Sequence, residues 1–310
     1  MQKKSRKPGK AIPKHVRQPS KKRTKKSALT GAILAVSGVS VLVLAVSGLL
    51  FGAIEAAPKP VQGSAAQASS TLSDASLPSV SEPAQPTVQT VRFSATGDNL
   101  IHDGIYLQAA KRTGGTGYDF APVYENLKEF YAEFDLNWLN QETLVTDEIE
   151  PDGYPQFCTP AACGQAVYDL GMRVISMSNN HAYDKYAKGI EATMRFWDSM
   201  PDDVLTTGLW SDETEIPILE KNGIAFAFLS YTESTNGIPT PDDAPAHVIY
   251  TSQEDVIQSQ IQRANELADV VVAGMHWGVE NSHDVTPSQE LLPQNLPDWS
   301  AHVSIGTQPH

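Results

Sequence analysis

Side chains that could bind a metal ion or transfer a proton follow four separate apolar stretches of the sequence. They are Asp98, Glu142, the adjacent pair Asn180 and His181, and His276. Carboxylate and amide oxygens combined with imidazole nitrogen suit a site for zinc, manganese or iron. Taken singly, each is typical of an ordinary turn, a helix cap or a half-buried histidine. Four such endings in succession favour one shared metal site over coincidence.

The elements that must position these side chains alternate between strands and helices. Apolar runs predict strands at 90–96, 136–139, 172–177, 224–231 and 269–275, and helical periodicity predicts helices at 119–134, 160–170, 189–200 and 252–268. Folds of this kind place ligands at the carboxyl ends of their strands. The sequence therefore predicts an α/β domain with its site along a shared edge of the strands.

The first 90 residues differ in composition from the rest of the chain. Residues 1–27 form a basic tail, and residues 28–54 contain no charged residue. This apolar run exceeds the roughly 20 residues needed to cross a bilayer as a helix. A cleavable signal peptide would have a shorter apolar region of about 7 to 15 residues, so a retained transmembrane helix is favoured. Residues 55–90, rich in Ala, Ser, Pro and Gln, are predicted to form a disordered linker.

The basic tail also predicts the orientation of the anchor, because Lys and Arg are retained on the cytoplasmic side. We expect a single-pass protein of the cell membrane, with a cytoplasmic N-terminus and an extracytoplasmic domain at 91–310. That domain has 10 Lys and Arg against 33 Asp and Glu, a formal charge of −23. Such a charge disfavours nucleic acid and other polyanions as partners unless cations intervene. A bound metal ion would resolve that conflict.

The chain contains two cysteines, Cys158 and Cys163. Outside the cytoplasm they could form a disulfide, and the alternatives are half of a zinc site or two free thiols. A disulfide requires a Cα separation of about 4.4 to 6.8 Å. A spacing of five residues beside a helix start does not ensure this separation, so a disulfide and its absence are equally compatible with the sequence.

Six short motifs lie in order along the outer domain. They are Gly97-Asp98, Asn140-Gln141-Glu142-Thr143, Gly153-Tyr154-Pro155 with Thr159-Pro160, Ser178 to Asp184, His276-Trp277-Gly278-Val279-Glu280, and Pro287-Ser288-Gln289. Together they resemble the poly-gamma-glutamate capsule biosynthesis family called CapA, which is similar in fold to the calcineurin-like metallophosphatases. The resemblance implies a β-sandwich flanked by helices, with one or two divalent transition metal ions (Mn, Fe or Zn) at the strand ends.

The resemblance also implies roles for individual residues. Asp98 would bind a first metal ion, Glu142 would occupy the bridging position, and Asn180 and His276 would bind a second. The family's last motif corresponds to Gly306-Thr307-Gln308-Pro309-His310, and its final residue, His310, would be a further ligand. Because His181 matches the histidine that hydrolytic relatives use near the leaving group, it would supply a proton.

Two positions depart from the family pattern, and the chain ends early relative to it. Metallophosphatases have a histidine where this chain has Leu100, with His102 nearby as a substitute, and the final motif has Gln308 in place of an expected histidine. A single metal ion, or a weakened second one, is therefore an alternative. Pro293 and Pro297 stand where a helix is expected, and the family pattern continues beyond the last motif, so we expect an incomplete C-terminus.

Two functions are compatible with these features. The first is a membrane-anchored, metal-dependent enzyme that makes, releases or attaches an anionic polymer such as poly-gamma-glutamate, together with other membrane subunits of capsule synthesis. The second is a non-catalytic component of an envelope assembly that binds polymer or partner through the same edge. A general phosphoesterase acting on small substrates is a weaker alternative, since a fold does not determine a function.

Overall fold

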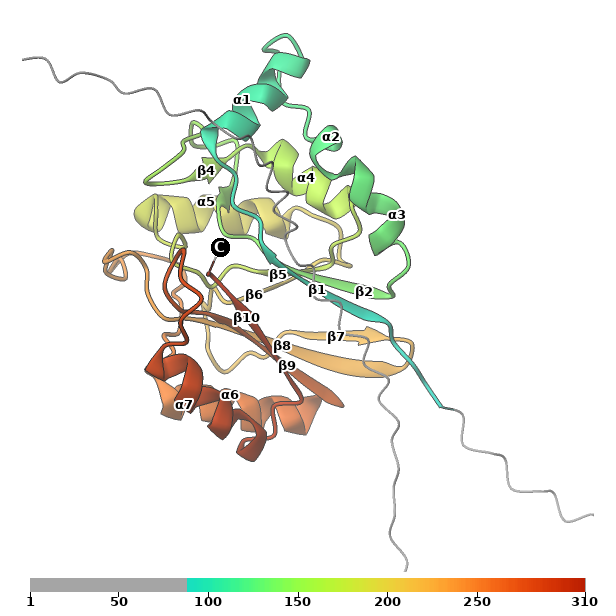
Figure 1. Ribbon diagram of the computed structural model, residues 1–310, viewed down its shortest axis with the longest axis vertical. Coiled ribbons are helices and arrows are strands. Elements are labelled where there is room, and N and C mark those ends of the chain that lie inside the picture. Colours follow the sequence, from blue (N-terminus) through green and yellow to red (C-terminus); the bar gives the residue numbers. More distant parts are fainter. Residues whose placement is uncertain (1–87, 310) are drawn as a thin grey trace, which may run out of the picture. The chain divides into compact units, whose positions relative to one another are not determined.

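The computed structural model of the chain describes residues 88–309 (Figure 1). The predicted basic tail, the predicted transmembrane helix, nearly all of the predicted linker and His310 lie outside these residues. Within 88–309, none of the helices combines the length and the hydropathy needed to cross a membrane.

Two four-stranded sheets form the centre of the described domain. The first is entirely parallel and contains, in spatial order, β1 (Phe93–Asp98), β2 (Leu136–Asn140), β5 (Val174–Ser176) and β6 (Leu205–Thr207). The second contains β10 (Val303–Thr307), β9 (Val270–His276), β8 (Ile224–Thr232) and β7 (Ile218–Lys221). Only the β7–β8 pair of that sheet is antiparallel. Two short strands, β3 (Leu144–Val145) and β4 (Cys158–Thr159), pair separately.

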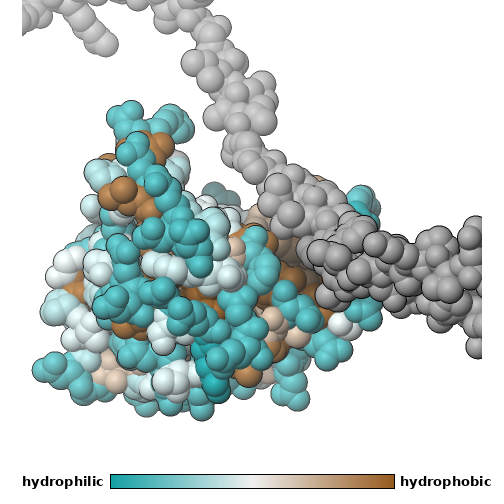
Figure 2. Space-filling model, turned by 90° about the horizontal axis from the view of Figure 1, so that it is seen from below, coloured by the Kyte–Doolittle hydropathy of each residue, from teal (hydrophilic) through white to brown (hydrophobic). Residues whose placement is uncertain are grey.

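Helices cover the outer face of each sheet (Figure 1). Those beside the first sheet are α1 (Asp103–Arg112), α2 (Ala121–Tyr124), the 3₁₀ turn η1 (Glu125–Leu127), α3 (Lys128–Tyr131), α4 (Ala161–Asp169) and α5 (Tyr186–Asp198). Those beside the second are α6 (Glu254–Leu267) and α7 (Pro287–Asp298). On the face shown in Figure 2, hydrophilic residues cover most of the described surface and hydrophobic residues form small separate patches.

Alternating side chains of the central strands build three apolar layers. Trp138 and Phe228 point into the layer between the two sheets. Their neighbours Leu139 and Leu229 point outward, toward the helices that cover each sheet. Because both faces of β8 and β9 are buried, their sequences are largely apolar runs rather than alternating ones. The predicted α/β class is confirmed, with layers in the order helix, sheet, sheet, helix.

The two sheets approach each other closely at Gly274 of β9. A Cβ atom at this position would lie 3.0 Å from Cζ2 of Trp138 on β2 and 3.1 Å from the Ser230 hydroxyl. Such contacts are tighter than most side chains tolerate, so glycine allows the indole to sit against the opposite backbone. This contact fixes the separation of the two sheets two residues before β9 ends.

The helix predicted at 119–134 forms three short pieces instead of one. Tyr124 and Tyr131 are buried against the first sheet, whereas Val123 and Leu127 are 39% and 40% exposed. The apolar residues therefore do not lie on a single helical face, and the segment turns along the sheet as α2, η1 and α3.

Helix α7 continues through Pro293 and Pro297, although proline disfavours helix formation and the sequence therefore argued against a helix here. A capping box holds its start, with the Thr286 hydroxyl accepting from the Gln289 backbone and the Gln289 side chain accepting from the Thr286 backbone. Leu292 and Leu296 are buried against the second sheet. Packing and capping thus outweigh the low helix propensity of the two prolines.

Both cysteines are free and fully buried. Of the alternatives left open by the sequence, the structure therefore contains two free thiols and no disulfide between them. Burial raises the pKa of both thiols to about 11. At pH 8 only about one thiol in a thousand is then in the reactive thiolate form.

We therefore predict that iodoacetamide modifies neither Cys158 nor Cys163 in the folded protein within the time in which it modifies a free thiol completely. Unfolding in urea without reductant should make both thiols reactive, as measured by intact mass. An unfolded, unreduced protein without reactive thiols would instead indicate a disulfide.

A second prediction concerns Gly164 in α4. A Cβ atom there would collide with the Phe196 ring of α5 and lie 3.0 Å from the Val145 side chain. We expect Gly164→Ala to lower the free energy of unfolding by about 1 to 3 kcal/mol, despite the higher helix propensity of alanine. In α1, Gly104 has nothing within 4 Å of such a Cβ atom. Gly104→Ala should therefore leave the urea midpoint unchanged or raise it.

Candidate functional site

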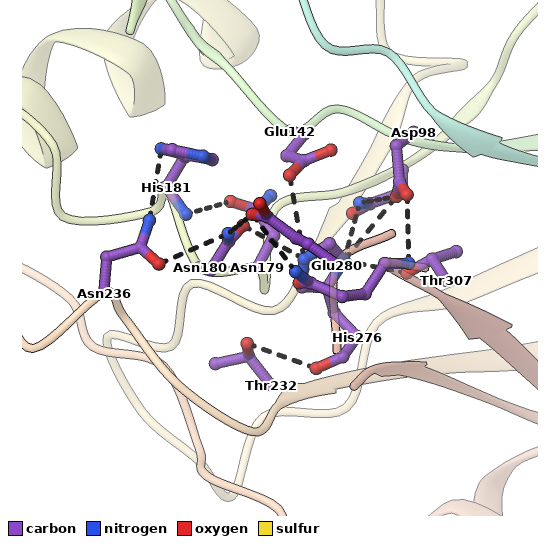
Figure 3. A network of polar contacts seen from close by, with 12 residues as sticks. Asp98, Glu142, Asn179, Asn180, His181, Thr232, Asn236, His276, Glu280 and Thr307 are labelled. Atoms are coloured by element: carbon purple, nitrogen blue, oxygen red, sulfur yellow. Dashed lines mark hydrogen bonds and ion pairs between the residues drawn. The ribbon is translucent and has the colours of Figure 1, made fainter. Parts of the chain in front are cut away.

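Strands of both sheets end at one group of polar side chains (Figure 3). Asp98 and Asn140 are the last residues of β1 and β2 in the first sheet, and His276 and Thr307 are the last residues of β9 and β10 in the second. Parallel strands direct their carboxyl ends to the same edge of a sheet, and here two such edges face each other. The predicted shared edge therefore exists, and it is contributed by two sheets.

The imidazole of His276 lies at the centre of this group and is 2% exposed. Its Nε2 atom is 3.1 Å from Oδ1 of Asn180 and 3.8 Å from Oε1 of Glu142. Its Nδ1 atom is 2.9 Å from the Thr307 hydroxyl and 3.6 Å from Oδ1 of Asp98. Each ring nitrogen thus faces one carboxylate, that of the buried Glu142 or that of the partly buried Asp98.

Asp98 is held by donors from three directions. Asn140 donates to its Oδ1 over 2.6 Å, and the backbone N–H of Gln308 donates to its Oδ2 over 2.9 Å. Burial raises the pKa of this carboxyl, but the contacts with His276, Asn140 and Gln308 together outweigh burial and lower it. Asp98 is therefore ionised at neutral pH. Gln308 has a φ of 105°, a left-handed conformation that residues other than glycine rarely adopt.

His181 forms a buried pair with Asp184, three residues further along the chain. Its Nδ1 atom is 2.7 Å from Oδ2 of Asp184, which also accepts from the Phe157 backbone over 2.6 Å. The Phe157 ring lies edge-on to the imidazole, with centroids 4.7 Å apart. If Asp184 accepts the Nδ1 proton, the Nε2 atom is left to exchange a proton with a ligand.

The turn that carries these residues is fixed by Asn179. Its Oδ1 atom accepts from the His181 backbone over 3.1 Å, and its Nδ2 atom donates to the Gln141 carbonyl over 3.0 Å. Asn179 therefore ties the segment after β5 to the segment after β2. Its role is structural, whereas its neighbour Asn180 faces His276.

A cleft of ≈ 630 Å³ opens beside His181. Its other lining residues are Leu100, His102, Tyr154, Pro155, Phe157, Asn236, Glu280 and Asn281. His102 lies edge-on to the Phe157 ring, with centroids 4.9 Å apart. The sequence offered His102 as a substitute for a missing metal ligand, but the structure places it in the wall of the cleft.

Several residues of the site had no role assigned from the sequence. Asn140, Thr307 and Glu280 all occur in the motifs or at their ends, yet nothing in the sequence indicated their contacts. Asn140 and Thr307 contact His276 or Asp98, and Glu280 lies within reach of the Asn180 amide. Their position in or next to a motif was the one feature of the sequence that indicated a place in the site.

Donor atoms of the kinds that hold a cation lie on one side of His276. Oxygen and nitrogen ligands about 2.1 Å from a metal ion lie about 3.0 to 3.4 Å from one another. The 3.1 Å between His276 and Asn180 falls in this range, and the 3.8 Å between His276 and Glu142 exceeds it. A cation on Nε2 would require the proton on Nδ1, where Thr307 can accept it. Asp98 faces that other nitrogen. Within 88–309, no three His, Cys, Asp or Glu side chains form a metal-binding group by themselves.

Comparison with known proteins identifies a family and individual relatives of this chain. The family model described as "Bacterial capsule synthesis protein PGA_cap" matches residues 92–310. The "Capsule biosynthesis protein CapA" of Bacillus anthracis is 30% identical over 152 residues, which are 47% of this chain and 36% of the relative. The "PGA biosynthesis protein CapA" of Bacillus subtilis (strain 168) is 27% identical over 234 residues, 73% of this chain and 60% of the relative. The chain thus spans less than two thirds of the length of either relative.

A solved structure is also similar in part. It is a "Putative 5'-Nucleotidase" from Staphylococcus aureus in complex with alpha-ketoglutarate, with a TM-score of 0.41 and 10% identity, over 69% of this chain and 44% of that one. The family match covers more than half of the chain and includes every motif found in the sequence. The chain therefore belongs to the bacterial capsule synthesis protein family PGA_cap.

Proposed function

We propose that this protein is a metal-dependent, hydrolase-like enzyme that acts on an anionic polymer such as poly-gamma-glutamate during capsule synthesis. The observation that carries the proposal is the buried His276 imidazole between Asp98 and Glu142, with the His181–Asp184 pair one residue from Asn180. The names of the relatives support the pathway and the polymer. The donor set supports the metal.

Glu142, Asn180 and His276 would hold the cation. When bound, a divalent ion polarises the bond to be cleaved and neutralises developing negative charge. Asp98 would stay ionised and, with Thr307, orient the His276 ring. His181, held by Asp184 and Phe157, would donate its proton to the departing group.

The acidic domain gives the cation a further role. With 33 Asp and Glu against 10 Lys and Arg in residues 91–310, the domain repels a polyanion at distances below about 8 Å, the screening length at physiological salt. A cation at the strand ends would provide the local positive charge that such a polymer needs. We propose Mn, Fe or Zn, as one or two ions, and a fold related to the metallophosphatases.

The proposed location follows from the first 54 residues. We propose that residues 28–54 anchor the protein in the cell membrane with the N-terminus in the cytoplasm. The domain would then act on polymer outside the cytoplasm, beside other membrane subunits of capsule synthesis.

A non-catalytic role in polymer or partner binding is the second candidate. It is favoured by the side chain of Gln308, which provides an amide where the family pattern has an imidazole. The two candidates differ in whether His181 must transfer a proton.

The first prediction from this proposal concerns metal content. Protein purified with Mn²⁺ or Zn²⁺ should contain stoichiometric metal by mass spectrometry, and His276→Ala should lose it because the substitution removes the one nitrogen ligand of the proposed set. Asp98→Asn should weaken metal binding about 10- to 100-fold, since it supports the ring from Nδ1. Exposed His283 provides the control, and His283→Ala should bind metal normally. Full metal content in folded His276→Ala would contradict the proposal.

The second prediction concerns proton transfer. Asp184→Asn and His181→Ala should lower the rate of poly-gamma-glutamate shortening about 10²- to 10⁴-fold while leaving metal content unchanged. Polymer length is measured by size-exclusion chromatography, with Lys188→Ala on the exposed surface of α5 as the control. If His181→Ala restores capsule in a deletion strain as well as the wild type does, the non-catalytic role is correct.

A further inference from the structure

Two side-chain amides from different sheets converge on one carboxylate oxygen at the mouth of the site. Nδ2 of Asn180 lies 3.4 Å from Oε1 of Glu280, and Nε2 of Gln308 lies 3.5 Å from the same atom. Asn180 follows β5 of the first sheet and Gln308 follows β10 of the second. Figure 3 shows the Glu280 side chain lying across Asn180 and His276. The two amides thus present donors to a single negatively charged oxygen.

Glu280 is held loosely in this position. Both distances exceed the 2.7–3.2 Å range typical of N–H···O hydrogen bonds. Asn180 and Gln308 are 1% and 8% exposed, whereas Glu280 is exposed. The donors are therefore fixed in the domain, and the acceptor is a surface side chain that another carboxylate could replace.

The chain turns Glu280 back over the strand ends through two left-handed residues. Gly278 has a φ of 100° and Asn281 a φ of 59°. Glycine and asparagine are the residues that adopt such values most readily. A Cβ atom on Gly278 would lie 2.7 Å from Nε2 of Gln289, so this turn is also fitted closely against α7. The position of Glu280 is therefore built into the backbone after β9.

Charge makes this position important for an anionic ligand. Among the residues that line the cleft beside His181, Glu280 is the one with a carboxylate, and none is Lys or Arg. An acidic ligand entering the cleft meets this negative charge. If a carboxylate of that ligand accepts hydrogen bonds from the same two amides, it competes with Glu280 for one position.

We propose that the amides of Asn180 and Gln308 form a subsite for one carboxylate of the substrate, and that Glu280 fills this subsite until the substrate displaces it. The proposal deepens the proposed function and rests on it for the identity of the polymer. The Glu280 carboxylate itself shows that a carboxylate oxygen fits between the two amides. Because Asn180 precedes His181, a side-chain carboxylate bound here would lie next to the group proposed to transfer the proton.

The test uses the full-length protein and glutarate, a dicarboxylate, as the probe. Binding is measured by titration calorimetry, once with EDTA and once with Mn²⁺. In both conditions Glu280→Ala should bind glutarate about tenfold more tightly than the wild type, because the subsite is no longer occupied by the chain's own carboxylate. Glu280→Gln, which removes the charge and keeps the shape, should also gain affinity. Glu290→Ala, at an exposed position of α7, should not change it.

A second variant tests the donors. Gln308→Met keeps the size of the side chain and removes its N–H groups, so Glu280→Ala combined with Gln308→Met should lose the gain. Equal glutarate affinity in the wild type and both folded Glu280 variants would overturn the proposal. A gain for inorganic phosphate without a gain for glutarate would also overturn it. A gain for glutarate in a protein that never shortens poly-gamma-glutamate would support the subsite while refuting the hydrolase.

Discussion

One buried imidazole faces two carboxylates, the buried Glu142 and the partly buried Asp98, and the rest of the domain is arranged around this contact. Removing a charge from water is costly unless an opposite charge or several hydrogen bonds compensate for it. Asp98 receives that compensation from His276, Asn140 and the backbone of Gln308. Glu142 faces the other nitrogen of the same ring, so a single imidazole is shared by the two carboxylates.

Much of the fold could be predicted because its central strands are buried on both faces. β8 and β9 appear in the sequence as uninterrupted apolar runs, and the predicted boundaries differ from the observed ones by a single residue at each discrepant end. The edge strands β6 and β10 were missed because they are short or mixed with polar residues. Helix α7 was doubted because propensity argues against Pro293 and Pro297, while the burial of Leu292 and Leu296 is a tertiary effect.

The sequence allowed several residues of the site to be predicted, but not most of the contacts between them. Asp98 and His276 could be found because a polar residue at the end of an apolar strand is a local pattern. Their approach to within 4 Å depends on how two sheets pack, for which no local pattern exists. For the same reason, no local sequence pattern indicates the contacts of Thr307 or of the amide pair that faces Glu280. His102 is close in sequence to Asp98, but the structure places its ring in the wall of the cleft beside Phe157.

The close packing of Trp138 against Gly274 couples the interior of the domain to the geometry of the site. This contact sets the spacing between the two sheets, and the polar side chains of the site stand at the strand ends of both. A substitution that changed the volume of this interior would shift one set of polar side chains relative to the other without touching any of them. Within this family, substitutions should accordingly be as restricted at Trp138 and Gly274 as at His276.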